Sequence, residues 1–536
     1  MPKIKLPAIY ASHMTLQRDK VLHVEGTAEG CASVRILLDG VSSRAAVVNG
    51  HFTCAVGPFP AGTGKTLQIF ADDQTQPLLT LGDIQIGDIW LACGQSNMEY
   101  FLRYDADWNY TKKQEHNPLI RMYNVPQIAF ASQDRHPFGS GYWFEEGDPA
   151  WAVFSAPGYH FARVIQPDAG VPVAIVGCNW GGTPACAWTP LSSFSEEPLN
   201  IYLKEYEEAV SMYSPEELKR LSEEGLAFEN SYRHELEWRT MMYGLTEEEQ
   251  QLWMKEHEGD PAIPMGPWHP WRPGGLYETM VLPVSTLSVK GVLWYQGESD
   301  SGHGDLYDRT MTALIRSFRD TWKEPELPFL FVQLAPFGKW LECGNEGYAQ
   351  VRAAQDTVSG TVPGTAMASI MDLGSYEDIH PKFKMEVGRR LALLALKYVY
   401  GRDILADPPF CSAACAKAQE DGSLLIHMEI ANTGEELYAD DTPGEGFRIF
   451  TGQVRLTPAG SSCDGQELSG FECCIKDRGL QILLSSEDAA QAAAAGTLWI
   501  SYDEQNYCTA HIWNSAGLSM KPFRICVNLP AAETAE

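Results

Sequence analysis

Residues 83–100 read DIQIGDIWLACGQSNMEY, and this stretch decides how the chain folds. Its first part is an apolar run, which is typical of a strand buried on both faces. The run stops at GQSNM, where Ser96 is flanked by Gly94 and Asn97. A serine on a tight turn at the end of a buried strand holds its hydroxyl at the rim of a sheet, where a hydrolase needs its nucleophile. The alternative interpretation is a serine that merely caps the next helix.

Three later apolar runs end in the same abrupt way, and the residues that follow them carry polar side chains or none. These residues are Gly181 and Gly182 in WGGTP, Gln296, Gly297 and Glu298 in WYQGESD, and Glu377, Asp378 and His380 in YEDIHP. Runs of this kind predict strands that are buried on both faces, as in a parallel sheet. Because such sheets place their ligands at the carboxyl ends of the strands, we expect these residues to meet Ser96 there.

The strings GQSNM, WGGTP, WYQGESD and DIHP, in this order, resemble the sialate O-acetylesterase family of SGNH-type hydrolases. They also resemble related carbohydrate acetylesterases that act on plant polysaccharides. The stretches 14–30 and 274–284 extend the resemblance over roughly the first three quarters of the chain. The resemblance implies an α/β fold with a flavodoxin-like α/β/α hydrolase core. It also implies ester hydrolysis by Ser–His–acid chemistry without a metal or other cofactor.

Within this scheme Ser96 is the predicted nucleophile and His380 the base that activates it. His303 and His269 lie in Gly-rich and Pro/Trp-rich segments, which makes them weaker candidates for the base. The acid would hold the imidazole in the correct tautomer and stabilise its cation. We favour Asp378 for this role, and three other carboxylates stay open as alternatives: Glu377, Glu298 and Asp372.

Attack on an ester creates an oxyanion that preorganised hydrogen-bond donors must hold. By resemblance, these donors are the backbone N–H of Ser96, a glycine N–H of the WGGTP turn and the side chain of Gln296. We favour Gly182 in the glycine pair because it directly precedes Thr183, with Gly181 as the alternative. A tight turn that needs positive φ would equally explain both glycines.

Composition bounds the partners of the chain. Its 536 residues include 70 acidic and 40 basic ones, for a net charge of −30. This balance argues against binding to nucleic acid, to an anionic membrane or to polyanionic substrates. The first ten residues lack the apolar region of a signal peptide, and the 13 cysteines show neither paired nor metal-ligand spacing. We therefore expect a cytoplasmic protein with structural thiols and no metal; whether it forms a homo-oligomer stays open.

The pattern along the chain predicts five segments. Short alternating runs separated by glycines indicate β-sandwiches at both ends, and a charged stretch with helical spacing interrupts the core. The expected segments are an N-terminal β-sandwich (1–85), the first part of the SGNH core (86–195), a helical and aromatic insertion (196–272), the second part of the core (273–404) and a C-terminal β-sandwich (405–536). The insertion is expected to serve either as packing alone or as a lid or subunit contact.

The segment 264–280 is dense in proline, tryptophan and tyrosine, so it is not expected to form a regular helix. Exposed aromatic rings stack on sugar faces, and Trp268, Trp271 and Tyr277 are therefore candidate substrate contacts. Ordinary core packing is the alternative for each of them.

The function that these residues favour is a serine carbohydrate O-acetylesterase that releases acetate from acetylated oligosaccharides. We favour plant-type xylo-, xyloglucan- or manno-oligosaccharides as substrates, because the negative charge disfavours anionic sialosides. A sialate 9-O-acetylesterase is the alternative within this class. A catalytically silent glycan-binding protein is the alternative outside it. A lipase-like α/β-hydrolase is disfavoured because GQSNM lacks the G-x-S-x-G spacing of that fold.

Overall fold

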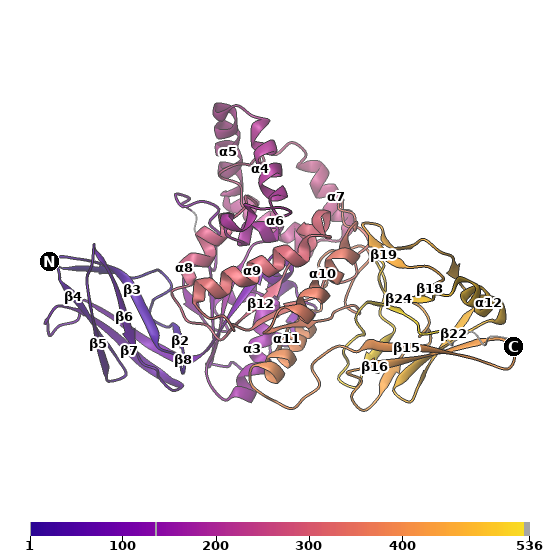
Figure 1. The fold of residues 1–536 in the computed structure, drawn as a ribbon. Helices are drawn as coiled ribbons and strands as arrows, with labels where there is room; N and C mark the ends of the chain where they lie inside the picture. The colour runs from indigo at the N-terminus through magenta and orange to yellow at the C-terminus, as the bar shows by residue number, and fades with distance from the viewer. Residues whose placement is uncertain (1, 135–136, 530–536) are drawn as a thin grey trace.

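The computed structural model describes residues 2–134 and 137–529 of the chain. A strand-rich region at each end flanks a central α/β part, and a group of helices projects from the centre (Figure 1). The prediction of an α/β protein with strand-rich flanks is confirmed.

The central sheet is built on β8 (Leu79–Gly94), the strand that ends at the GQSNM turn. Its parallel neighbours are β11 (Val173–Asn179) on one side and β12 (Gly291–Tyr295) on the other, followed by β13 (Phe329–Val332) and β14 (Thr365–Ala368). In chain order these five strands lie 2-1-3-4-5, an order common among doubly wound sheets. The sheet continues beyond β11 through β9 (Ile120–Asn124) and the antiparallel β10 (Trp143–Phe144).

The two faces of this sheet are covered by different helices. Trp90 and Ala92 of β8 pack with the helices α3 (Ala156–Ala169) and α11 (Lys384–Tyr398). The alternate residues of β8 face the other way, toward α9 (Tyr307–Trp322) and α10 (Tyr348–Thr361). Both faces are therefore apolar, which explains why the sequence of this strand lacks simple alternation.

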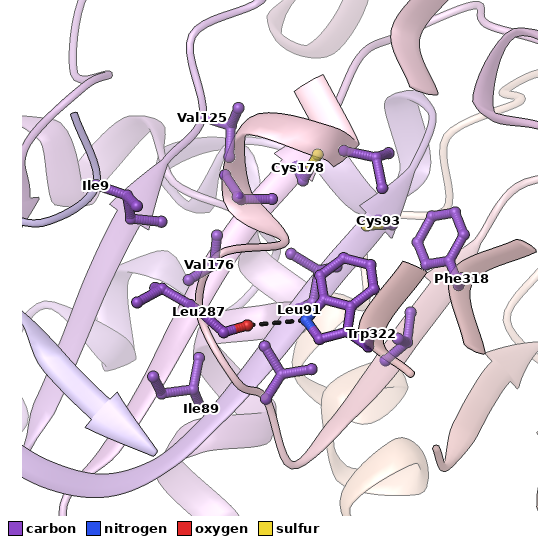
Figure 2. Packing of buried hydrophobic residues seen from close by; sticks show 14 of the residues in the cluster. Ile9, Ile89, Leu91, Cys93, Val125, Val176, Cys178, Leu287, Phe318 and Trp322 are labelled. Atoms are coloured by element: carbon purple, nitrogen blue, oxygen red, sulfur yellow. Dashed lines mark hydrogen bonds between the residues drawn. The ribbon is translucent and has the colours of Figure 1, made fainter. Parts of the chain in front are cut away.

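Figure 2 shows the α9 face of the sheet at close range. Leu91 and Cys93 of β8 lie near Phe318 and Trp322 of α9 in one apolar cluster. The indole N–H of Trp322 donates to the carbonyl of Leu287 at 2.8 Å. Each side chain of this size contributes about 1.5–3 kcal/mol when it is fully buried, so the cluster anchors the strand whose end carries Ser96.

The N-terminal region consists of two small sheets. One has the order β1 (Lys3–Lys5), β3 (Leu22–Glu29) and β6 (His51–Val56). The other joins the first half of β8 to its neighbouring strands: β2 (Thr15–Gln17), β7 (Gly62–Ala71), β4 (Ser33–Leu38) and β5 (Val41–Ala46). Since β8 runs unbroken from this sheet into the central one, position 85/86 lies inside a single strand.

Four helices form the projecting group: α4 (Ile201–Ser211), α5 (Pro215–Glu229), α6 (Tyr232–Gly244) and α7 (Glu247–Glu256). Helices α5 and α7 begin at the sequences SPEE and LTEEE. The Ser214 hydroxyl accepts from the N–H of Glu217, and Thr246 forms a capping box with Glu249. The segment after α7 is irregular up to Gly274, as its prolines predict, and a π-helical turn then covers Tyr277–Val281.

The C-terminal strands form two four-stranded sheets that share one apolar core. The first sheet contains β15 (Phe410–Ala418), β16 (Leu424–Ala431), β23 (Gly479–Leu484) and β22 (Phe471–Lys476). The second contains β21 (Glu467–Leu468), β18 (Phe447–Phe450), β24 (Trp499–Tyr502) and β26 (Phe523–Cys526). A two-stranded sheet, a short hairpin and α12 (Ser486–Ala495) complete the region.

Candidate active site

Ser96 lies at the carboxyl end of the central strand, as the first residue of the short helix α1 (Ser96–Glu99). The turn needs Gly94, whose φ is +139° and whose added Cβ would meet the Tyr295 carbonyl oxygen at 2.1 Å. A glycine is required at such a close approach of two backbones. The strand, the turn and the neighbouring strand therefore fix the nucleophile candidate together.

His380 reaches Ser96 from the loop that follows β14. Its Nε2 lies 3.0 Å from Ser96 Oγ, within hydrogen-bond distance, and the two residues are 284 positions apart in the chain. The imidazole is buried between Tyr243 and Trp340, whose rings both meet it edge-on. Burial lowers the pKa of His380 below its ordinary value, although Asp378 partly opposes this effect. The neutral form that a general base requires is thus favoured.

Asp378 is the carboxylate nearest to the other side of this imidazole among the described contacts. Its Oδ1 lies 3.6 Å from His380 Nδ1 and accepts the backbone N–H of His380 at 2.8 Å. Burial raises the pKa of Asp378, but His380 and Lys382 outweigh it, so the pKa is lowered overall. The carboxylate is therefore ionised, but its distance to Nδ1 exceeds that of a hydrogen bond.

The other three carboxylates have different surroundings. Glu377 is exposed. Asp372 forms two hydrogen bonds with Arg390, at 2.6 and 2.7 Å, and accepts from the indole of Trp513 in the C-terminal region. It therefore joins the core to the C-terminal strands.

Glu298 lies in a buried chain of polar groups beside the nucleophile. Its Oε1 accepts from the Asn97 amide at 2.5 Å, and the Asn97 carbonyl oxygen accepts from Lys384 Nζ at 2.5 Å. Burial raises the pKa of Glu298 and lowers that of Lys384 to about 7. The Lys384 ammonium also lies over the rings of Tyr100 and Tyr295. Glu298 thus contacts the turn of Ser96 through Asn97.

The two glycines of WGGTP lie against the nucleophile turn and differ in their hydrogen bonding. The N–H of Gly181 donates to Glu99 Oε2 at 2.6 Å, and a Cβ on this residue would be 3.3 Å from that of Ser96. Gly182 has a φ of +75°, which only glycine adopts readily. Among the described residues its N–H finds no backbone or side-chain acceptor. This difference favours Gly182 over Gly181 as an N–H that can meet a substrate.

The Gln296 amide is fully buried and already engaged. Its Nε2 lies within hydrogen-bond distance of Gln95 Oε1, the Thr183 carbonyl and Asp300 Oδ2. Its Oε1 accepts from the Tyr307 hydroxyl at 2.9 Å. The role of Gln296 as an oxyanion donor stays a prediction, and it requires that one of these contacts be released.

The three aromatic candidates do not gather at one place. Trp271 is 42% exposed, and a Cβ added to Gly182 would be 3.4 Å from its ring, so this indole lies beside the glycine turn. Tyr277 instead lines an open groove of ≈ 890 Å³ next to α9, where its hydroxyl meets that of Thr321 at 2.6 Å. Trp268 is half-buried. Trp271 alone of the three has a described contact with a predicted site residue.

Sequence reasoning missed several residues that the fold brings to the site: Glu99, Asn97, Lys384, Arg239 and Tyr243. Their only sequence signal was the placement of Asn97 and Glu99 inside GQSNME. Within the described residues, no three His, Cys, Asp or Glu side chains come together in a way that could hold a metal ion. No helix in the same part of the chain is long and apolar enough to cross a membrane.

Comparison with known proteins connects this site to a family. A family model described as "carbohydrate esterase, sialic acid-specific acetylesterase" matches residues 261–397, which include Gln296, Glu298 and His380. This part of the chain is thus similar to that family. Its curated relatives include the sialate O-acetylesterases of rat and human, each 25% identical over 64% of this chain.

The match to these relatives is partial. The chain spans 61% of the length of the rat protein and 58% of that of the human one. Among solved structures, a carbohydrate acetylesterase from Xanthomonas citri has the same fold: it is 24% identical, covers 98% of this chain and 99% of its own, and gives a TM-score of 0.70. The arrangement of central core and flanking strands is thus shared along almost the whole chain.

Proposed function

We propose that this chain is a serine carbohydrate O-acetylesterase with an SGNH-type core. The observation that carries the proposal is the 3.0 Å contact between Ser96 Oγ and His380 Nε2 at the carboxyl ends of the central strands. A hydroxyl is a weak nucleophile until an adjacent base takes its proton, and this contact supplies that base. The family and the names of its members point to the same chemistry.

The reaction follows from the positions of the groups. Ser96 Oγ attacks the acetyl carbonyl while His380 Nε2 accepts its proton. The N–H groups of Ser96 and Gly182 hold the oxyanion, each worth about 2.7–4 kcal/mol of transition-state stabilisation. His380 then returns the proton to the departing sugar oxygen. A water activated by the same imidazole cleaves the acetyl-enzyme and releases acetate.

Asp378 is the proposed acid partner of His380. In the imidazolium state, the Nδ1–H of His380 needs a carboxylate to stabilise its charge. Nδ1 has no hydrogen-bond partner among the described residues, and the Asp378 carboxylate lies 3.6 Å from it. Catalytic hydrogen bonds are often long in the free enzyme and tighten when substrate binds. A small closing movement of the loop would bring the 3.6 Å separation into that range.

Neutral oligosaccharides of the plant type are the proposed substrates. Among the described residues around Ser96, the cations Arg239 and Lys384 are both buried and engaged, Arg239 with Glu99 and Lys384 with Asn97. The half-exposed Lys382 lies 3.9 Å from Asp378, which offsets its charge. The exposed Trp271 beside Gly182 offers a face for a sugar ring. The 9-O-acetyl sialic acid alternative draws its support from the names of the curated relatives.

One screen separates these substrates. The purified protein would be given acetylated xylo-, xyloglucan- and manno-oligosaccharides and 9-O-acetyl sialic acid, and kcat/KM for acetate release would be compared. We expect the neutral oligosaccharides to lead. A clearly higher value for the sialic acid would reverse the assignment. Equal inactivity of the native protein and of Ser96→Ala toward 4-nitrophenyl acetate would favour a silent glycan-binding protein.

A reducing compartment such as the cytoplasm is the proposed location. All 13 cysteines are free thiols, and several are exposed, among them Cys343 and Cys474. Exposed thiols persist where glutathione and thioredoxin keep them reduced. Thiol titration of protein taken from its native cells tests this, with 13 reactive groups expected after denaturation.

A further inference from the structure

Glu99 occupies the space between the nucleophile helix and the WGGTP turn. It lies three residues after Ser96 on α1 and is almost completely buried. Its Oε2 accepts the N–H of Gly181, and its Oε1 accepts from the Gln127 amide at 3.0 Å. Gly181 directly precedes Gly182, so Glu99 holds the residue next to the candidate oxyanion donor.

The counterion of Glu99 comes from the helical insertion. Arg239 of α6 places Nη2 2.7 Å from Glu99 Oε1 and also donates to Gln127 Oε1 at 3.1 Å. The side chains of Arg239 and Glu99 are both less than a tenth exposed. Gln127 in turn donates to the carbonyl of Asn179, at the end of β11. The charge pair is thus enclosed in a network that begins on the insertion and ends at the glycine turn.

A second residue of α6 anchors the same helix at the site. Tyr243 lies one helical turn after Arg239, and its hydroxyl is 3.4 Å from the Ser96 carbonyl. Its ring meets the His380 imidazole edge-on, with centroids 5.2 Å apart. Two residues on one face of α6 therefore contact the surroundings of the nucleophile.

We propose that Arg239 is a positioning residue for the oxyanion site, through which the helical insertion sets the geometry of the Gly181–Gly182 turn. This inference rests on the proposed esterase function and assigns the insertion a part in it. Arg239 keeps Glu99 oriented, Glu99 holds Gly181, and the Gly182 N–H is thereby aimed at the oxyanion. The ion pair with Arg239 fixes the Glu99 carboxylate in the orientation in which it accepts the Gly181 N–H, a charge-assisted hydrogen bond.

The test compares Arg239→Met with Arg220→Met. Arg220 lies on α5 of the same insertion and pairs with Glu224 at 2.8 Å, but both side chains are more than half exposed. With 4-nitrophenyl acetate as substrate, we expect Arg239→Met to lower kcat by about 10–100-fold, less than the loss of an oxyanion donor itself, and to leave KM within about threefold. Arg220→Met should match the native protein in both constants.

A second readout does not depend on the substrate. A fluorophosphonate probe transfers its phosphonyl group to Ser96 Oγ: the O–P bond forms, fluoride leaves with the electrons of the P–F bond, and His380 takes the proton. The phosphonyl oxygen occupies the oxyanion site, so labelling by Arg239→Met should slow in the same proportion as kcat. Should the native protein label but hydrolyse no acetyl ester, the esterase assignment fails, while the labelling rates still decide the role of Arg239.

Two further variants keep the proposal open to refutation if Arg239→Met folds poorly, which circular dichroism would show. Arg239→Lys keeps the charge and should recover most of the activity. The double variant Glu99→Gln/Arg239→Met removes both charges and should be more active than Arg239→Met alone. The proposal is overturned if a folded Arg239→Met matches Arg220→Met in kcat and labelling, if Arg239→Lys recovers no activity, or if the native protein neither hydrolyses esters nor labels.

Discussion

The two halves of the candidate catalytic pair are held very differently. The Ser96 turn is buried and enclosed by Gly94, Glu99 and Asn97, each with its own partner in another part of the chain. The loop that carries Asp378 and His380 has few such contacts on its outer side. Tyr376 and Glu377 are exposed, and Asp378 is 3.6 Å from the nitrogen that it is proposed to serve.

This contrast indicates a division of labour. The position of a nucleophile must be fixed before substrate arrives, because small displacements of reacting atoms cost rate. The acid acts only when the imidazole becomes charged, so its hydrogen bond can form at that point. We therefore expect the Ser96 side to be preorganised by the core and the Asp378 side to be completed when substrate binds.

The largest effect is expected at the Ser96 turn. Ser96→Ala should lower kcat by about 10⁴–10⁶-fold because no other group can form the acyl-enzyme. The substitution removes one hydrogen bond to His380, so the free energy of unfolding should change by only about 1 kcal/mol. Acetate release and thermal unfolding measure the two quantities. A folded variant that retains most of its activity would remove Ser96 from the mechanism.

The next largest effect is expected in the loop that carries Asp378 and His380. Asp378→Asn should lower kcat by about 10²–10⁴-fold, because an amide neither favours the correct tautomer nor stabilises the imidazolium. Glu377→Gln is the matched control, since it makes the same chemical change one position away on an exposed side chain, and it should alter kcat by about twofold at most. Equal, small changes of kcat in both variants would favour Glu298 as the acid partner of His380.

The pH dependence sharpens the same comparison. Since only the neutral imidazole accepts the proton, kcat/KM should fall as the pH drops through the pKa of His380. Burial lowers that pKa from 6.5, so the acid limb should lie below pH 6.5. Asp378 opposes this lowering, and its replacement by Asn should move the limb to still lower pH. A limb that moves upward would show that Asp378 does not face the imidazole in solution.

The smallest effect is expected at Trp271, which lies beside the Gly182 turn and is the candidate contact for the sugar. Trp271→Ala should raise KM for an acetylated oligosaccharide by up to about tenfold, the equivalent of one ring contact, and leave KM for 4-nitrophenyl acetate almost unchanged. Tyr438→Ala, an exposed aromatic in the C-terminal region, is the control. If both substrates respond equally to Trp271→Ala, the indole supports the glycine turn rather than a sugar.

The sequence was informative wherever local chemistry decides structure. Apolar runs that end in glycine or polar residues marked the carboxyl ends of β8, β11 and β12, and capping residues marked the starts of α5 and α7. The sequence was less informative about which residues each side chain contacts. Tyr277 shares its aromatic segment with Trp271, yet it faces a groove beside α9, because a helical turn directs the two rings to different sides.

By itself, the sequence determined the α/β class, the strand ends and the residues able to act as nucleophile and base, because these follow from periodicity and residue type. Only the tertiary structure decided what surrounds them. Lys384 meets Asn97 across 287 positions, and Tyr243 meets Ser96 across 147. Such contacts depend on how the insertion and α11 pack onto the core, and no local pattern encodes the partner of a buried charge. The local sequence thus indicates which residues are reactive, and tertiary packing supplies the charged and polar groups that surround them.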